Sequence, residues 1–259
     1  MSVPLVKPFL KATTKQRWEG AENIPTSGGV ILAMNHVSHI DPLTAAHITW
    51  DHGRLSRYLA KASLFKIKVV GPVLRAAGQI PVERASAGAD ALKAAIDAVN
   101  DGKLIVVYVE GSITKDPDGW PMVGKSGAAR IALATGAPVI PVGQWGAQFL
   151  FNGYEKKFRP FPRKLVQMKV GTPIDLSDLE HSDRPAVEDV NLATDRIMSA
   201  IVGLVADIRG EEPPAELYDP RKARKAAREA EQAAKTEPAE QKEQADPGAA
   251  NGSDGVSEA

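Results

Sequence analysis

The stretch that decides the fold is VILAMNHVSHIDP, residues 30–42. Five apolar residues come first and a polar turn follows. Pro42 then stands where a helix can begin, because proline is well suited to the first helical position. Asp41 falls just before it, which makes this residue a natural candidate for the N-cap. A strand that leads through a short turn into a helix is the building unit of an α/β domain.

The same alternation continues along the chain on the carboxyl side of this stretch. Short runs rich in β-branched residues alternate with Ala-rich segments of helical period. We expect strands at 30–34, 57–61, 104–109, 138–142 and 165–170, and helices at 42–50, 87–100, 127–135 and 187–209. The sequence therefore predicts an α/β fold, with a mainly parallel sheet flanked by helices.

Composition limits the chemistry that this fold can carry. The 259 residues are 43% hydrophobic and 25% charged, which is typical of a globular protein with a sizeable core. There is no cysteine, so a thiolate nucleophile and a Cys-ligated metal are excluded, and the histidines show no metal-ligand spacing. We therefore expect no metal and no bound cofactor. Lys and Arg total 32, as do Asp and Glu, and this balance gives no indication of a nucleic-acid partner.

Three regions follow from the distribution of apolar and charged residues. Residues 1–17 form a basic, amphipathic segment that we expect to face a membrane, and residues 18–218 form the folded domain. Residues 219–259 are rich in Ala, Glu, Lys and Gln, and we expect them to be disordered, apart from a frayed helix at 221–235 as an alternative. With neither a signal peptide nor a run long enough to span a bilayer, we expect peripheral attachment at the cytoplasmic face of the membrane.

Two basic stretches stand out inside the domain. Residues 54–84 contain seven Lys or Arg and the single acid Glu83, interleaved with apolar side chains, and a second stretch runs over residues 156–169. Either stretch can be an ordinary solvated face. The first also has the character of a surface for anionic lipid headgroups or a phosphorylated substrate.

The turn between the strand and the helix carries the residues with chemical potential. His36 and Asp41 stand across this turn, where a carboxylate can accept the proton of one imidazole nitrogen and leave the other nitrogen free as a base. This is the arrangement of a serine hydrolase without the enzyme's own serine, so the attacking hydroxyl must come from the substrate. A loop histidine and a helix cap remain the plain structural alternatives.

Four segments in order resemble the glycerophospholipid acyltransferase family, in particular the bacterial 1-acylglycerol-3-phosphate O-acyltransferase group. Asn35-His36-x4-Asp41 resembles the first motif of that family, and residues 78–84 (GQIPVER) resemble the second. Residues 108–112 (YVEGS) resemble the third, and residues 137–142 (APVIPV) resemble the fourth. The resemblance covers about 110 residues and implies a glycerol-3-phosphate acyltransferase-like fold.

The resemblance also implies a reaction. His36 would deprotonate a lysophosphatidate-like glycerol hydroxyl, which attacks the thioester of acyl-CoA or acyl carrier protein, and Asp41 would hold the imidazole. Arg84 would bind the phosphate of the acceptor, and Glu110 would contact the acceptor. Backbone amides beside Gly111 or at the start of the Asp41 helix are candidate donors to the oxyanion. Gly111 and Ser112 are thus further candidates for substrate binding, and the implied partners are a thioester donor, a lysolipid and an anionic membrane surface.

The third motif departs from the family pattern, which has proline before the glutamate and arginine two residues after the glycine. This chain has Val109 and Ile113 at these places. Lys125, Lys115 or Arg130 would then have to supply the missing positive charge. A glycolipid, or a lysophospholipid with a headgroup, is therefore an alternative acceptor.

Three rival functions remain to be weighed. Residues 119–126 (GWPMVGKS) satisfy the P-loop pattern, but the strand ends about ten residues earlier, and proline removes an amide that a phosphate cradle needs. A non-catalytic lipid-binding protein would not need His36 and Asp41. A hydrolase is disfavoured because no G-x-S-x-G elbow is present and Ser38 lies inside the turn.

Overall fold

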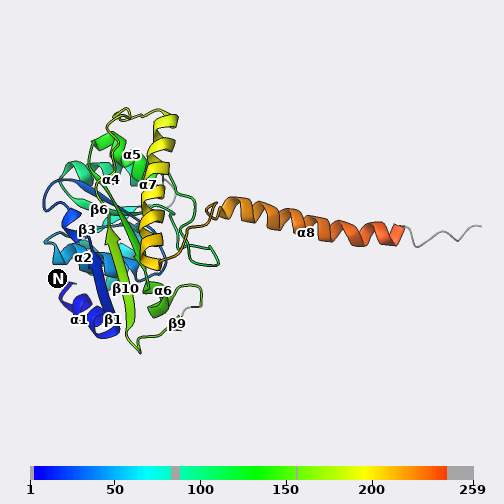
Figure 1. The fold of residues 1–259 in the computed structure, drawn as a ribbon, viewed down its shortest axis with the longest axis horizontal. Helices are drawn as coiled ribbons and strands as arrows, with labels where there is room; N and C mark the ends of the chain where they lie inside the picture. The colour runs from blue at the N-terminus through cyan, green and yellow to red at the C-terminus, as the bar shows by residue number, and fades with distance from the viewer. Residues whose placement is uncertain (1–2, 83–87, 156, 244–259) are drawn as a thin grey trace, which may run out of the picture. The chain divides into compact units, whose positions relative to one another are not determined.

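The computed structural model describes residues 3–82, 88–155 and 157–243. These residues form two compact units, which divide after Tyr218. Figure 1 labels most of the elements. The helices are α1 (Val3–Thr13), α2 (Asp41–Asp51), α3 (Val70–Ala76), α4 (Ala89–Asn100), α5 (Gly127–Thr135), α6 (Ala147–Leu150), α7 (Val187–Arg209) and α8 (Pro220–Glu243), with short 3-10 turns η1 (Ala21–Asn23) and η2 (Ala62–Lys66).

A six-stranded sheet forms the centre of the first unit, with the order β1-β10-β7-β2-β6-β3. Its strands are β1 (Thr14–Glu19), β2 (Val30–Met34), β3 (Ser56–Arg57), β6 (Leu104–Tyr108), β7 (Val139–Trp145) and β10 (Lys164–Val170). The strands pair in parallel except where β10 meets β7. Two small sheets consist of β4 (Leu59–Lys61) with β5 (Ile80–Val82) and of β8 (Phe151–Asn152) with β9 (Lys157–Phe158). The α/β prediction is confirmed.

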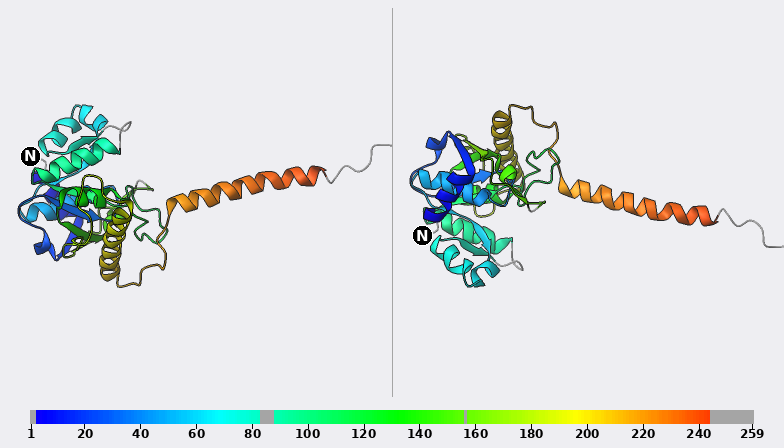
Figure 2. Two further views of the ribbon diagram at one scale, coloured as in Figure 1. Left: turned by 90° about the horizontal axis from the view of Figure 1, so that it is seen from above. Right: turned by 90° about the horizontal axis from the view of Figure 1, so that it is seen from below.

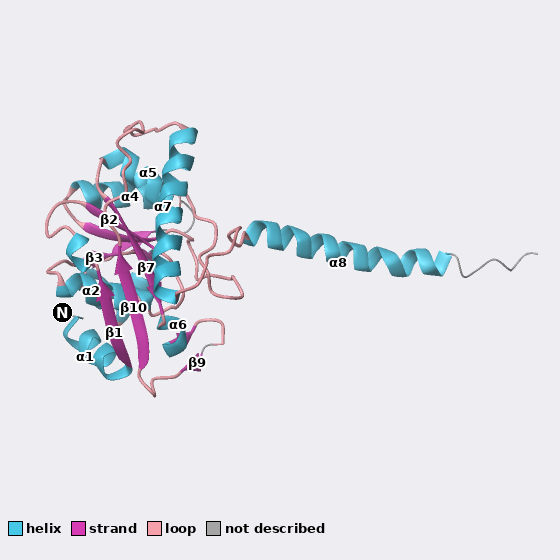
Figure 3. Ribbon diagram, in the orientation of Figure 1, coloured by secondary structure: helices cyan, strands magenta, loops and turns pink. Residues whose placement is uncertain are grey.

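Helices cover both faces of the sheet, and Figure 3 shows the magenta strands between cyan helices. Ile31 and Ala33 of β2 pack into a core with α4, α5 and α7. Val30 and Leu32 point the opposite way into a second core, which includes residues of α2. Because both faces are buried, β2 reads as a continuous apolar run rather than as an alternating one.

The ends of the chain depart from the sequence-based expectations. Residues 14–17, assigned to a membrane-facing segment, belong to β1, whose six residues all pair with β10. This strand was missed because its exposed positions carry Lys15, Arg17 and Glu19, as befits a sheet edge.

The expectation of disorder beyond residue 219 is not met over residues 220–243, which form α8. The Asp219 side chain accepts the Arg221 amide at the helix start, and Ala, Lys, Arg and Glu are strong helix formers. The described helices include none with the length and apolar character needed to cross a bilayer.

The expected strand at 57–61 is divided between two sheets. Ser56 and Arg57 pair with β6 in the central sheet, and residues 59–61 pair with β5 in a small one. Between β4 and β5 lie η2 and α3, neither of which the sequence analysis predicted. Figure 2 shows this cyan segment at the edge of the domain beside α4 in both views.

Candidate active site

The register of the sheet determines where the site lies. Met34, the last residue of β2, pairs with Tyr108, the last residue of β6. The turn that carries His36 and the loop that begins at Val109 therefore leave the sheet side by side at its carboxyl edge. This is the edge at which α/β sheets expose their ligands.

His36 and Asp41 meet as the sequence analysis predicted. The Nδ1 atom of His36 lies 2.7 Å from Oδ2 of Asp41, and the same oxygen accepts the amides of Val37 (2.7 Å) and Ser38 (2.8 Å). Asp41 is fully buried, and burial raises the pKa of its carboxyl group, against the lowering effect of His36 and the two amides. The Nε2 atom of His36 forms no hydrogen bond with any residue that the structure describes.

The helix start differs from the expectation. The helix α2 begins at Asp41 itself, and Ile40 occupies the cap position without a side-chain hydrogen bond to the helix. Asp41 turns its carboxylate back toward the preceding loop, since its oxygen receives amides from residues 37 and 38. The helix-cap alternative for Asp41 is therefore wrong, and its carboxylate accepts hydrogen bonds from the turn and contacts the imidazole.

Tyr108 packs against the face of the His36 imidazole, a role that was not predicted from the sequence. Its ring stacks on His36 with the centroids 4.2 Å apart, and Tyr58 continues the stack behind it at 6.4 Å. The only signal in the sequence was an aromatic residue at the end of an otherwise aliphatic strand. Stacking leaves the ring of His36 little freedom to rotate.

The Glu110 side chain forms a hydrogen bond with the backbone of the turn that carries His36. Its Oε1 accepts the amide of His36 at 2.7 Å, and its Oε2 accepts the amide of Met122 at 3.0 Å. Burial raises the pKa of this carboxyl group to about 8, although the two amides act to lower it. Both oxygens are thus engaged by backbone, whereas the family resemblance implied contact with the acceptor.

A second pair fixes the end of β2 to β7. Asn35 and Gln144 exchange three hydrogen bonds of 2.7–3.0 Å through their side chains and backbones, and both are buried. The amide of Thr114 donates to the carbonyl of His36 at 2.8 Å and closes the turn from the third side. Gln144 was missed, although a polar residue in the apolar run 138–145 was a visible signal.

A cavity of about 640 Å³ opens beside His36. Four of the residues proposed from sequence line it, namely His36, Gly111, Ser112 and Lys125. Lys125 lies across Gly111, which adopts φ of +71°, and any side chain at residue 111 would strike the lysine. Apolar residues complete the wall: Pro42, Leu59, Val82, Ala91, Val106, Val107 and Val109, beside Tyr58 and Tyr108.

The remaining cations predicted near the site fall elsewhere. Arg84 lies outside the described residues, although Val82 lines the cavity. Lys115 and Arg130 are not among the residues that line the described cavity, so Lys125 is the cation there. Ile113 is buried at 9% exposure, and its carbonyl accepts the hydroxyl of Tyr154 at 3.1 Å.

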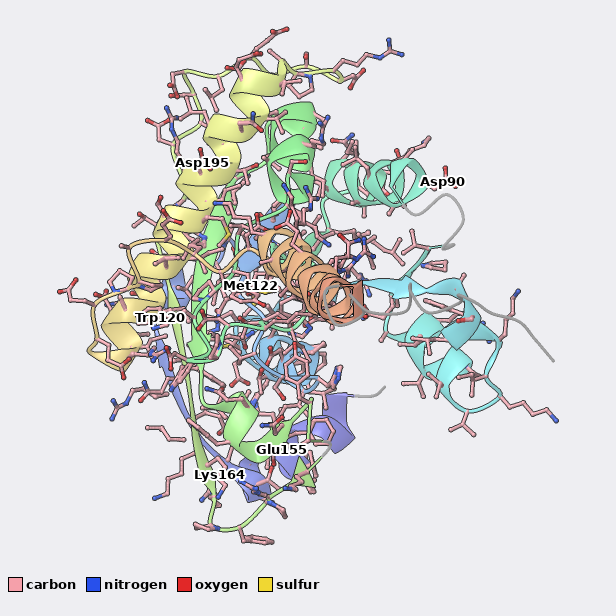
Figure 4. The ribbon with its side chains drawn as sticks, turned by 90° about the vertical axis from the view of Figure 1, so that its right-hand side faces the viewer. Asp90, Trp120, Met122, Glu155, Lys164 and Asp195 are labelled. Carbon is pink, nitrogen blue, oxygen red and sulfur yellow. The ribbon has the colours of Figure 1, made fainter. Side chains whose placement is uncertain are left out.

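The P-loop pattern does not form a phosphate cradle. The amides of Trp120, Met122, Val123 and Lys125 donate to Asp116, Glu110, Tyr218 and Val109 respectively. Trp120 and Met122, both labelled in Figure 4, are buried, and the guanidinium of Arg209 lies 4.1 Å from the Trp120 ring. The amides that would hold phosphates are thus already used within the domain.

A larger cavity of about 830 Å³ contains none of the proposed site residues. Basic residues of the β9–β10 region line it, including Lys157, Arg163 and Lys164, together with Trp145 at the end of β7. The smaller cavity is the candidate active site, because an imidazole paired with a buried carboxylate is found there.

The model of the acyltransferase family matches residues 15–145, about half of the chain, so the chain belongs to the acyltransferase family. All of the proposed site residues lie within the matched range.

Several relatives carry one and the same name, 1-acyl-sn-glycerol-3-phosphate acyltransferase. The Bacillus subtilis protein is 26% identical over 160 residues, which are 62% of this chain and 74% of that relative. The Borreliella burgdorferi protein is 36% identical over 125 residues, 48% of each chain. The Brassica napus chloroplast protein BAT2 is 30% identical over 140 residues, 53% of this chain and 38% of that one. The match thus spans half or less of two of these relatives.

A solved structure shows the same fold. The crystal structure of the 1-acyl-sn-glycerophosphate acyltransferase PlsC from Thermotoga maritima superimposes with a TM-score of 0.59. The superposition covers 82% of this chain and 81% of that one at 23% identity.

Proposed function

We propose that this protein transfers a fatty acyl group from acyl-CoA or acyl carrier protein to the free glycerol hydroxyl of a lysophosphatidate-like acceptor, in phospholipid synthesis. The observation that supports this proposal most is the His36–Asp41 pair at the mouth of a largely apolar cavity. The names of the relatives support the acceptor class.

The residues suggest the following sequence of events. Nε2 of His36 takes the proton of the acceptor hydroxyl as its oxygen attacks the thioester carbonyl, and Asp41 stabilises the imidazolium that results. The tetrahedral intermediate collapses with cleavage of the C–S bond, and the thiolate receives the proton from His36. The reaction thus forms one C–O bond, breaks one C–S bond and moves one proton from the acceptor hydroxyl to the thiol, and it needs no other reactant.

The oxyanion needs a donor, and two of the amides considered from sequence are already engaged. The amide of Gly111 donates to Tyr108, and the amide of Asp41 donates to Ser38. Within the described residues the amide of Ser112 has no partner, and this residue lines the cavity with His36. We therefore favour Ser112 as the oxyanion donor, with Lys125 as the cation for the acceptor's phosphate.

One observation favours the alternative acceptors. Ile113 replaces the arginine of the family motif and is buried, so this position offers no charge to the cavity. A glycolipid, or a lysophospholipid whose phosphate carries a headgroup, requires less positive charge at this place than a free phosphomonoester. A panel of lysophosphatidate, glycerol phosphate, lysophospholipids and glycolipids, offered with labelled acyl-CoA and read by mass spectrometry, distinguishes these acceptors.

The reaction itself is tested by a pair of histidine variants. His36→Ala should lower the turnover number by a factor on the order of 10²–10⁴, because the general base is lost. His39→Ala is the matched control: its ring is exposed three residues away and is not part of the cavity wall, so turnover should stay near that of the wild type. Wild-type turnover in His36→Ala would overturn the proposed mechanism, and absence of turnover with every acceptor would favour a non-catalytic lipid-binding protein.

A further inference from the structure

Residues 62–76, made of η2 and α3 with the turn between them, form a small lobe that stands at the edge of the domain in Figure 2. The backbone of Gly71 lies so close to the carbonyl of Phe65 that an added Cβ would be 2.1 Å from that oxygen. The guanidinium of Arg75 donates to the same carbonyl at 2.8 Å. These two contacts join α3 to η2 within the lobe.

The lobe displays its aliphatic side chains instead of burying them. Val69 is 78% exposed, and Leu64, Ile67, Val70 and Val73 are 37–47% exposed. Phe65 alone among the apolar residues of this segment is buried. Five large aliphatic side chains exposed within ten residues are costly in water and indicate a surface that meets an apolar partner.

The charge around these side chains is of one sign. From residue 54 to residue 82 the sequence has six Lys or Arg and no Asp or Glu. Lys66 and Lys68 are exposed and form no ion pair with any residue that the structure describes. Aliphatic side chains flanked by unpaired lysines match the chemistry of an anionic lipid bilayer, with acyl chains beneath phosphate headgroups.

The lobe is also connected to the reaction cavity. β4 and β5, the strands that lead into and out of it, pair in parallel, and Leu59 and Val82 from these strands line the wall of the cavity that holds His36. We propose that the lobe of residues 62–76 inserts into the surface of an anionic bilayer and brings the mouth of the cavity to the lipid acceptor. This inference builds on the proposed acyl transfer and adds the element through which the membrane is reached.

The amino-terminal segment, expected from sequence to face the membrane, is less suited to this role. Leu10 is fully buried, Lys7 is paired with Asp51, and residues 14–17 belong to β1. The aliphatic character of the lobe also argues for lipid rather than for an acidic carrier protein, which would bind through ion pairs at a more polar surface.

The test compares two double variants of the full-length protein. Ile67→Ser with Val69→Ser removes exposed aliphatic groups from the lobe, and Val187→Ser with Leu192→Ser removes similar groups, 61% and 43% exposed, from α7. Binding is measured by cosedimentation with vesicles of phosphatidylcholine and phosphatidylglycerol. Turnover is measured with long-chain lysophosphatidate in the same vesicles and with a short-chain, water-soluble lysophosphatidate.

We expect the lobe variant to bind vesicles at least about tenfold more weakly, because each exposed aliphatic side chain contributes to partitioning into the bilayer. Its turnover should fall on vesicles but not on the soluble acceptor, and the α7 variant should behave as the wild type does. Equal vesicle binding by the two double variants would overturn the proposal, as would an equal fall in turnover of the lobe variant on vesicles and on the soluble acceptor. If the wild type binds vesicles through the lobe yet acylates nothing, the acyl-transfer proposal fails and the docking surface stands.

Discussion

The Asp41 carboxylate holds three donors through one oxygen, and this determines which tautomer His36 adopts. Asp41→Asn preserves the size of the side chain but replaces the acceptor with a group that can also donate. We expect the turnover number to fall by a factor on the order of 10²–10⁴ with little change in KM for the acyl donor, because the imidazole loses its fixed tautomer and orientation. Initial rates check this, with circular dichroism to show that the variant is folded. Turnover within about threefold of the wild type would show that the pairing is not used.

Glu110 makes the stability of the domain depend on pH. Burial raises the pKa of its carboxyl group from 4.5 to about 8, so the folded protein retains a proton that the unfolded chain releases between these values. The free energy of unfolding should therefore fall as pH rises through this window, by at most about 1.4 kcal/mol per pH unit. Glu110→Gln cannot ionise and should lack this contribution.

Urea unfolding at several pH values gives the free energy of unfolding of the wild type and of the Glu110→Gln variant. Asp41, whose pKa is also raised by burial, remains in the variant, so the quantity of interest is the difference between the two slopes. Parallel pH profiles would contradict the assignment of the buried proton to Glu110.

At the scale of elements, the last turn of α7 fixes the loop that follows β6. The guanidinium of Arg209 lies 4.1 Å from the ring centroid of Trp120 and 4.3 Å from that of Trp145, and it donates to the carbonyl of Asp118 at 2.9 Å. Arg209→Lys retains the charge but loses the planar group, and should lower the free energy of unfolding by about 1–3 kcal/mol.

An arginine of the same helix provides the control. Arg196 pairs with Asp178 at the surface, where Arg196→Lys should cost less than about 1 kcal/mol. Urea titrations of both variants give the comparison, and equal losses would show that the stacking between two tryptophans contributes nothing.

Most of the strands that could be predicted from the sequence are largely buried on both faces of the sheet, and the helices that could be predicted end close to a glycine. β2 and α5 are examples: one is apolar throughout, and the other ends at Gly136 in the left-handed conformation. β1 could not be recognised, because an edge strand that alternates charged residues resembles a solvated segment.

At the site, the His36–Asp41 pair was predictable because its members lie only five positions apart along the chain. Glu110, Thr114 and Gln144 also hold the turn, but they lie 74 to 109 positions from the residues that they contact, and several of these contacts use backbone atoms. Such contacts leave no local pattern in the sequence.

At the scale of the whole molecule, the buried apolar residues described here all precede residue 206. A chain that ends at Tyr218 should therefore unfold within about 0.5 kcal/mol of the full-length protein. A chain that ends at Glu216 loses Leu217, which packs on the core, and Tyr218, whose carbonyl accepts the amide of Val123 at 3.1 Å. We expect this shorter chain to be less stable by about 1–3 kcal/mol, as measured by thermal unfolding; equal stability of the two truncated chains would contradict it.

The place of β1 at the border of the sheet matters for any shortened form of the protein. A deletion through residue 17 would remove four of the six residues that pair with β10. Residues 164–167 of β10 would then form an exposed edge strand whose backbone amides and carbonyls lack hydrogen-bond partners. An exposed edge strand can pair with strands of neighbouring molecules, so a deletion at the amino terminus that was meant to improve solubility would instead promote aggregation.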